Sequence, residues 1–116
     1  MRVRRLFEFE AAHALPNHPG QCREMHGHSY RLAVTVERAV DPVSGLAMDF
    51  SHLKRVVREH VVEVLDHRTL NDLLDNPTAE RIAVWIWERI EGPLEGGLVE
   101  IEVFETRSCS VVYRGA

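Results

Sequence analysis

The sequence predicts an α+β domain in which an antiparallel sheet carries two helices on one face. Residues 2–13 and 26–37 alternate between apolar and polar side chains, as half-buried strands do. Residues 53–65 and 78–90 instead repeat apolar side chains at helical spacing, and residues 97–113 return to alternation. The resulting order, ββααββ, is typical of an antiparallel sheet with both helices packed on one face.

The length and composition describe one domain that spans residues 1–116. A chain of 116 residues with 45% apolar and 28% charged side chains has the balance of a soluble globular protein. No apolar run approaches the roughly 20 residues of a membrane span, and acidic residues follow the basic N-terminus where a signal peptide has an apolar core. We therefore expect a cytoplasmic protein with free thiols at both cysteines.

The net charge limits the kinds of partner that this protein is expected to bind. A formal charge of −4 gives no general attraction to nucleic acid or to an anionic membrane surface. We expect a small molecule as the partner, with local basic clusters serving a site.

The first two strands are predicted to pair with each other. The first strand places its apolar residues and one histidine on a single face: Val3, Phe7, Phe9, Ala11, His13. Turn-forming residues at 16–20 follow, and then His28, Tyr30 and Leu32 begin the apolar face of the second strand. The two strands are expected to form an antiparallel ladder.

The two helices have recognisable ends. Residues 53–65 form an apolar stripe, with Asp49 or Ser51 as the N-cap and an end near Asp66. Thr78 is the expected N-cap of the second helix, and Gly92 and Pro93 end it. Within the second helix, Trp85 is interpreted as a core residue and Trp87 as an interface residue.

The last two strands are predicted to form a second antiparallel pair. Residues 99–105 alternate and finish at Glu105, and a turn near Arg107 leads into residues 109–113. Cys109 falls on the apolar face of this last strand and is interpreted as a small buried residue.

Three histidines are predicted to converge where the first strand ends and the second begins. His26 and His28 stand two residues apart on one strand face, and His13 ends the apolar face of the neighbouring strand. Three imidazoles leave a fourth tetrahedral position for water or substrate, as in catalytic zinc sites, although other first-row metals also accept imidazole. The alternative is that each histidine is a hydrogen-bonded residue at the edge of the core.

Cys22 precedes this histidine pair on the loop. Its thiolate, acidified by a nearby dication, is suited to proton transfer near neutral pH. It is alternatively a fourth metal ligand, which would close the site, or a small buried residue.

Titratable groups also lie at the end of the first predicted helix and at the end of the third predicted strand. Asp66 next to His67 is either an acid–base pair, in which the carboxylate orients the imidazole, or a polar helix terminus. Glu105 ends an apolar strand face and is either buried with partners, directed at a ligand, or exposed at the sheet end.

Taken together, these segments resemble the 6-pyruvoyl-tetrahydropterin synthase family over almost the whole chain. The motifs that carry the resemblance are Phe9–His13, Cys22–His28, Met48–Phe50, Leu65–His67, Asn76–Glu80, Glu105–Thr106. Within the family, the three-residue gap between Cys22 and His26, the compact length and residues 112–115 most resemble the bacterial 6-carboxy-tetrahydropterin synthase branch of queuosine biosynthesis.

The resemblance implies a tunnelling fold. In this fold, ββααββ subunits join their sheets into a trimeric barrel, and two trimers stack into a homohexamer. Barrel closure would remove the two open edges that a four-stranded sheet otherwise exposes.

The resemblance also implies the roles of site residues. It implies that His13, His26 and His28 bind Zn²⁺. It implies further that Cys22 is the proton acceptor, and that Asp66 and His67 complete a relay from a neighbouring subunit. Glu105 would anchor the pterin ring, with the following residues nearby: Thr78, Thr106.

The implied reaction converts 7,8-dihydroneopterin triphosphate to 6-carboxy-5,6,7,8-tetrahydropterin, with release of acetaldehyde and triphosphate and without a redox cofactor. Candidates for the triphosphate contacts are Arg23, Lys54 and Arg107. One alternative is 6-pyruvoyl-tetrahydropterin synthesis, which eliminates triphosphate only. The other is a noncatalytic zinc- or pterin-binding module in which Cys22 closes the metal site.

Overall fold

The computed structural model describes all 116 residues and contains a five-stranded sheet of order β3-β1-β2-β4-β5. The strands are β1 (Arg2–His13), β2 (His26–Glu37), β3 (Arg68–Thr69), β4 (Leu98–Phe104) and β5 (Ser110–Tyr113). The first long helix runs as α1 (Phe50–Val57), a π-helical segment (Arg58–Val62) and α2 (Glu63–Leu65), and the second is α3 (Ala79–Ile90). Short 3-10 turns lie at Gln21–Arg23 and Leu70–Asp72.

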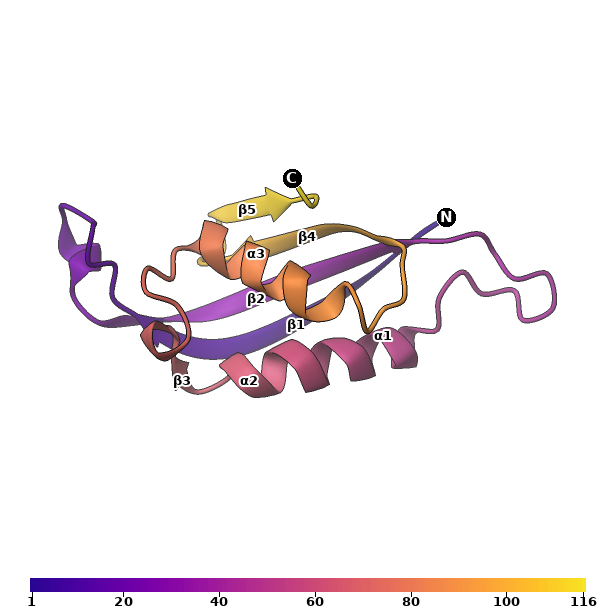
Figure 1. Ribbon diagram of the computed structural model, residues 1–116, viewed down its shortest axis with the longest axis horizontal. Helices are drawn as coiled ribbons and strands as arrows, with labels where there is room; N and C mark the ends of the chain where they lie inside the picture. The colour runs from indigo at the N-terminus through magenta and orange to yellow at the C-terminus, as the bar shows by residue number, and fades with distance from the viewer.

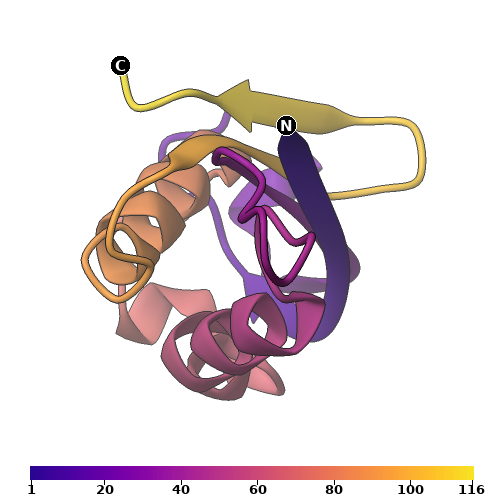
Figure 2. The ribbon, with the colours of Figure 1, turned by 90° about the vertical axis from the view of Figure 1, so that its right-hand side faces the viewer.

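The four predicted strands pair antiparallel, and both helices cover one face of the sheet, so the predicted α+β class is confirmed (Figures 1 and 2). The short strand β3 was not predicted. It pairs parallel to β1 at Ala11 and Ala12. Two residues are too few to carry a period, so the sequence pattern gave no signal for this strand.

Strands β1 and β2 pair over their whole length, from Arg2 opposite Glu37 to His13 opposite His26. Because side chains alternate between faces, this register places His13, His26 and His28 on the face that also carries the helices. The pairing of β1 with β2 therefore places the three imidazoles at one end of the sheet.

The core lies between this face and the helices. Fully buried side chains from both layers meet there: Phe9, Tyr30, Leu32, Val34, Leu53, Ile82, Ile86, Ile90, Ile101. Asp49 caps α1 by accepting a hydrogen bond from the Ser51 amide at 2.8 Å, and Thr78 caps α3 by accepting one from the Arg81 amide at 3.2 Å. Both helix starts therefore agree with prediction.

Two side-chain placements differ from expectation. Trp87 is 9% exposed and its ring packs edge-on against Tyr113, whereas Trp85 is only partly buried and lies under Arg89. Trp87, which was expected at an interface, is therefore a core residue, and Trp85 packs against the core as a partly buried residue. Cys109 is exposed, because the β4–β5 turn extends one residue further and β5 begins at Ser110.

None of the helices combines the length and the apolar character that crossing a membrane requires.

Candidate metal centre

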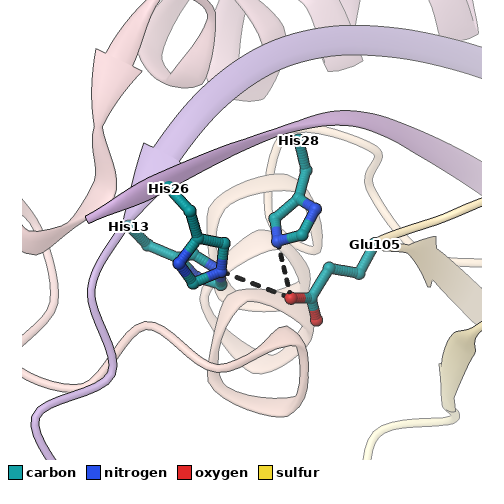
Figure 3. A group of neighbouring side chains, drawn as sticks. All are labelled: His13, His26, His28 and Glu105. Atoms are coloured by element: carbon teal, nitrogen blue, oxygen red, sulfur yellow. Dashed lines mark ion pairs between the residues drawn. The ribbon is translucent and has the colours of Figure 1, made fainter. Parts of the chain in front are cut away.

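Three histidines and one glutamate gather at the end of the sheet where β1 finishes and β2 starts. One ligand atom from each of His13, His26, His28 and Glu105 lies within 4.8 Å of all the others (Figure 3). The convergence of the three histidines agrees with the prediction, and the structure adds Glu105 as a fourth member. We refer to these four residues as the centre.

Backbone carbonyls fix which nitrogen of two imidazoles carries the proton. Nδ1 of His13 lies 2.8 Å from the carbonyl oxygen of Pro77, and Nδ1 of His26 lies 2.7 Å from that of Glu24. A carbonyl accepts only, so each Nδ1–H must donate. Their Nε2 atoms are then left with a lone pair that faces the centre.

The Nε2 atoms of His13, His26 and His28 are buried and none has a hydrogen bond of normal geometry, although Oε1 of Glu105 lies near two of them. Buried polar atoms without partners are costly, and three that face one another are rare in a folded protein. A divalent cation satisfies all three lone pairs at once, and imidazole suits zinc and other first-row metals. The three imidazoles, two of them oriented by backbone carbonyls, therefore fit a metal ion.

Burial favours the ligand form of His28. Removal from water lowers the pKa of His28, and the neighbouring His13 and His26 act in the same direction, while Glu105 opposes them. The lowered pKa favours the neutral imidazole, which is the form in which a histidine binds a metal.

Glu105 reaches the histidines from the turn that follows β4. Its Oε1 atom lies 2.9 Å from Nε2 of His28 and 3.3 Å from Nε2 of His13. Of the alternatives left open by the sequence, the structure therefore supports a partly buried carboxylate with partners. Only one of its oxygens contacts the histidines (Figure 3).

Tyr30 supports the centre from within the core. Its hydroxyl lies 3.3 Å from Nδ1 of His13, and its ring packs edge-on against His28 and in a stack on Phe9. Burial raises the pKa of Tyr30 well above its usual range, so the phenol stays neutral. Tyr30 stands two residues after His28 on the same strand, so the two side chains share one face of the sheet. This spacing could have identified Tyr30 as part of the site.

Cys22 lies in the 3-10 turn Gln21–Arg23 on the loop that leads to β2, and it is half-buried. Its backbone carbonyl accepts a hydrogen bond from the Leu15 amide at 2.8 Å, which ties the loop to the end of β1. The thiol is not among the atoms gathered in the centre. The arrangement thus gives no support to Cys22 as a fourth ligand.

Asp66 and His67 form a pair, but away from the centre. The Asp66 carboxylate accepts a hydrogen bond from the Glu10 amide at 2.8 Å and lies 3.1 Å from Nδ1 of His67. The Glu10 amide, with a smaller effect of His67, holds the pKa of Asp66 below its usual value. His67 has a φ of 59°, and its exposed ring lines a groove of about 390 Å³ beside Gly27 and Arg68.

The two predicted threonines lie next to residues of the centre in sequence, and their hydroxyls serve local backbone groups. Thr78 follows Pro77 and caps α3, and Thr106 follows Glu105 and accepts from the amide of Cys109 at 3.1 Å. The carbonyls of Pro77 and Glu24, which orient the imidazoles, were missed by sequence reasoning. A backbone acceptor has no residue-type signature that could reveal it.

The α+β fold and the centre together define a protein in which three histidines and one glutamate form a group that could hold a metal ion. Residues 2–116 match the family model described as 6-pyruvoyl tetrahydropterin synthase. The chain therefore belongs to the 6-pyruvoyl tetrahydropterin synthase family of enzymes.

Individual relatives carry several activities. The chain is 43% identical to a 6-carboxy-5,6,7,8-tetrahydropterin synthase of Synechocystis, over 92% of this chain and 88% of that protein. It is 49% identical to a dihydroneopterin monophosphate aldolase of Pyrococcus furiosus, over 76% and 73%. It is 36% identical to human 6-pyruvoyl tetrahydrobiopterin synthase, over 83% and 72%.

The fold also matches a solved member of the family. The structure of Caenorhabditis elegans 6-pyruvoyl tetrahydropterin synthase superposes with a TM-score of 0.91 at 26% identity, and the match covers 100% of this chain and 96% of that one.

Proposed function

We propose that this enzyme is a zinc-dependent lyase that converts 7,8-dihydroneopterin triphosphate and one water to 6-carboxy-5,6,7,8-tetrahydropterin, acetaldehyde and triphosphate, in queuosine biosynthesis. The observation that carries the proposal is the set of three buried Nε2 atoms that gather within 4.8 Å of one another at one end of the sheet. The 43% identity to the Synechocystis 6-carboxy-tetrahydropterin synthase supports this choice of reaction.

His13, His26 and His28 would hold the Zn²⁺ through their Nε2 atoms. A bound dication supplies Lewis acidity, which lowers the pKa of hydroxyl groups on the substrate side chain. The Nδ1–H donors of His13 and His26 stay engaged with Pro77 and Glu24, so both rings keep their orientation throughout.

Glu105 would recognise the pterin ring. A carboxylate accepts paired hydrogen bonds from the amino-pyrimidine edge, and Glu105 enters the centre from a turn at the open end of the sheet. In this role Glu105 would leave Nε2 of His13 and His28, which its Oε1 atom contacts in the structure. Thr78 and Thr106 are proposed as neighbouring contacts of the ring.

Cys22 would accept a proton from the substrate side chain, and the pair of Asp66 and His67 would move a second proton. Asp66 orients His67 through Nδ1 at 3.1 Å, which leaves Nε2 free to exchange a proton. The electrons of the internal redox step stay within the substrate, so no redox cofactor is required. Since His67 lies outside the centre of its own chain, we propose that a neighbouring subunit supplies it.

The assembly proposed for this relay is a homohexamer, a dimer of trimers, acting in the cytoplasm. In the sheet order, the outer strands are β3 and β5, and β3 covers β1 only at Ala11 and Ala12. Most of β1 and one side of β5 therefore present unpaired backbone groups. Pairing these edges between copies would close the sheets into a barrel.

A second candidate reaction is carbon–carbon cleavage of dihydroneopterin monophosphate, favoured by the 49% identity to the Pyrococcus furiosus aldolase. A third is synthesis of 6-pyruvoyl-tetrahydropterin by triphosphate elimination alone, favoured by the 36% identity to human 6-pyruvoyl tetrahydrobiopterin synthase. Each would use the same metal ligands.

The test is to incubate the zinc-loaded protein separately with 7,8-dihydroneopterin triphosphate and with the monophosphate, without redox cofactors. Products are identified by mass spectrometry, and acetaldehyde is assayed. We expect acetaldehyde and 6-carboxy-tetrahydropterin from the triphosphate. Formation of 6-pyruvoyl-tetrahydropterin, or turnover of the monophosphate only, would replace the proposed reaction with one of the alternatives. Absence of turnover of both would favour a binding module.

A further inference from the structure

The side chain of Asn71 binds both backbone polar groups of Ala14, the residue that follows His13. Its Oδ1 atom accepts a hydrogen bond from the Ala14 amide at 2.9 Å, and its Nδ2 atom donates one to the Ala14 carbonyl at 2.9 Å. Asn71 lies in the 3-10 turn Leu70–Asp72, 57 positions further along the chain. We refer to these two hydrogen bonds as the Asn71 clamp.

The clamp continues the pairing of β3 with β1 beyond the point where β3 ends. Strand β3 pairs with β1 at Ala11 and Ala12, each opposite a residue 57 positions later. The same offset separates Ala14 from Asn71. The backbone has by then entered the 3-10 turn, so the side-chain amide of Asn71 takes the place of the peptide group that a longer strand would supply.

Asparagine suits this position because its side-chain amide both donates and accepts hydrogen bonds. A carboxylate of the same size only accepts, and an apolar side chain does neither. The turn that presents Asn71 is itself fixed. Leu70 is 1% exposed, and its carbonyl accepts hydrogen bonds from the amides of Leu73 and Leu74 at 3.0 Å. Asn71 therefore reaches Ala14 from a turn that is anchored in the core.

The loop of residues 14–25, which carries Cys22, has few other ties to the fold. It projects past the end of the sheet (Figure 1), and none of its residues is buried. No salt bridge involves it. Apart from the Asn71 clamp, its hydrogen bonds join residues of the loop to one another or to His26. The clamp is therefore the one hydrogen-bonded link from this loop to a more distant part of the chain.

The clamp is coupled to Cys22 through the next residue of the chain. Leu15 follows Ala14, and its amide donates a hydrogen bond to the Cys22 carbonyl at 2.8 Å. A change in the direction of the backbone at Ala14 therefore moves the Leu15 amide and, with it, the half-buried Cys22. His13 is held independently, by the β1–β2 ladder and by the carbonyl of Pro77.

We infer that Asn71 is a positioning residue, which fixes the loop that carries Cys22 relative to the imidazoles of the centre. Its catalytic consequence rests on the proposed function, in which Cys22 accepts a proton from the substrate side chain. Proton transfer needs heavy atoms within roughly 2.6–3.2 Å of each other, and a displacement of about 1 Å can cost about 100-fold in rate. Asn71 acts on Cys22 through Ala14 and Leu15.

The test uses the full-length, zinc-loaded protein with Cys109→Ala, in which Cys22 is the only thiol. Asn71→Ala removes the clamp. Asn17→Ala is the matched control, because Asn17 is exposed on the same loop and its side chain makes no hydrogen bond. Circular dichroism, thermal unfolding and the zinc content check that both variants fold and bind the metal.

Two readouts follow the loop without requiring turnover. In Asn71→Ala, we expect the Leu15 amide to lose protection from hydrogen exchange by about tenfold or more, and Cys22 to react with iodoacetamide about tenfold faster. Both changes follow from release of the loop, and Asn17→Ala should show neither. Unchanged protection and unchanged alkylation in Asn71→Ala would overturn the inference, with or without an effect on activity.

Turnover of 7,8-dihydroneopterin triphosphate tests the consequence for the reaction. In Asn71→Ala, kcat should fall by about 10- to 100-fold, while KM and zinc affinity stay unchanged, because the metal ligands and Glu105 keep their places. A purely structural role would lower thermal stability and leave kcat per zinc-loaded chain unchanged, and that result would reject Asn71 as a positioning residue. Absence of turnover in the wild type would reject the proposed function instead, and the exchange and alkylation results would then decide the role of Asn71.

Discussion

The Oε1 atom of Glu105 lies 2.9 Å from Nε2 of His28, so the turn after β4 and the start of β2 meet at the centre. This contact joins the two halves of the chain, since the second half of the sheet supplies one carboxylate and the first half supplies all three imidazoles. It also shows that the position opposite the imidazoles is accessible to a charged group.

Replacing His28 with alanine should weaken zinc binding by at least about 100-fold, because one of three imidazole ligands is removed. His28 is only partly buried, so the variant should retain its fold. Zinc affinity is measured by competition with a chelator. His52→Ala on α1 is the matched control and should bind zinc like the wild type. Equal affinity in both variants would show that His28 is not a ligand.

Replacing Tyr30 with phenylalanine should lower zinc affinity by about tenfold, the smaller effect expected of a group that orients a ligand. The variant keeps the ring that stacks on Phe9 and removes only the hydroxyl beside Nδ1 of His13. Tyr113→Phe is the control, because Tyr113 packs on Trp87 instead. The Co²⁺-substituted protein should show an altered visible spectrum for Tyr30→Phe only. An unchanged spectrum and affinity would mean that the hydroxyl has no role in orienting His13.

Replacing Cys22 with alanine should reduce turnover by about 10²- to 10⁴-fold while leaving one zinc per chain, as expected for loss of a proton acceptor. Turnover is followed by the acetaldehyde assay and zinc by atomic absorption. Cys109→Ala is the control, since the Cys109 thiol is exposed on the turn before β5. Loss of zinc from Cys22→Ala would instead support a closed metal site.

Mixing two inactive variants tests whether two subunits share a site. Cys22→Ala and His67→Ala chains are unfolded and reassembled together in equal amounts. If His67 acts on a neighbouring subunit's centre, about one quarter of the sites receive both intact residues, so about one quarter of the wild-type activity should return. A monomeric mass by light scattering, or absence of recovered activity in a reassembled oligomer, would contradict the shared relay.

Asp66 should make the fold sensitive to acid. The hydrogen bond from the Glu10 amide depresses the pKa of Asp66 in the folded protein, so the unfolded chain binds the proton more readily. Its stabilising contribution is therefore complete above the ordinary value of 3.8 and is lost as pH falls through the lower folded pKa. Urea unfolding should show Asp66→Ala to be less stable than the wild type at pH 7, with the difference shrinking toward pH 2. A constant difference would exclude this role.

The strands β1 and β2 show what alternation alone can predict. Their period of two placed Phe7 and Phe9 with His13 on one face, and the structure confirms this face as the buried one. Cap chemistry similarly identified Asp49 and Thr78, because an N-cap depends on contacts within a few residues.

The predictions that were wrong concern a segment too short to show a hydrophobic period and a helix whose buried face was ambiguous. Strand β3 has two residues and depends on pairing with Ala11 and Ala12, which are distant in sequence. Trp87 was expected at an interface but lies in the core, because the packing of α3 against β5, which places Trp87 against Tyr113, is not visible in the sequence pattern.

The sequence by itself determined the α+β class, the β1–β2 ladder and the three histidines, since these follow from local periodicity and from residue chemistry. Only the tertiary structure decided the rest of the centre. Glu105 meets His28 across 77 positions of sequence, and the Pro77 carbonyl orients His13 from the start of α3. Such contacts depend on how the helices and the β4–β5 turn pack against the sheet, and that packing is a property of the whole fold.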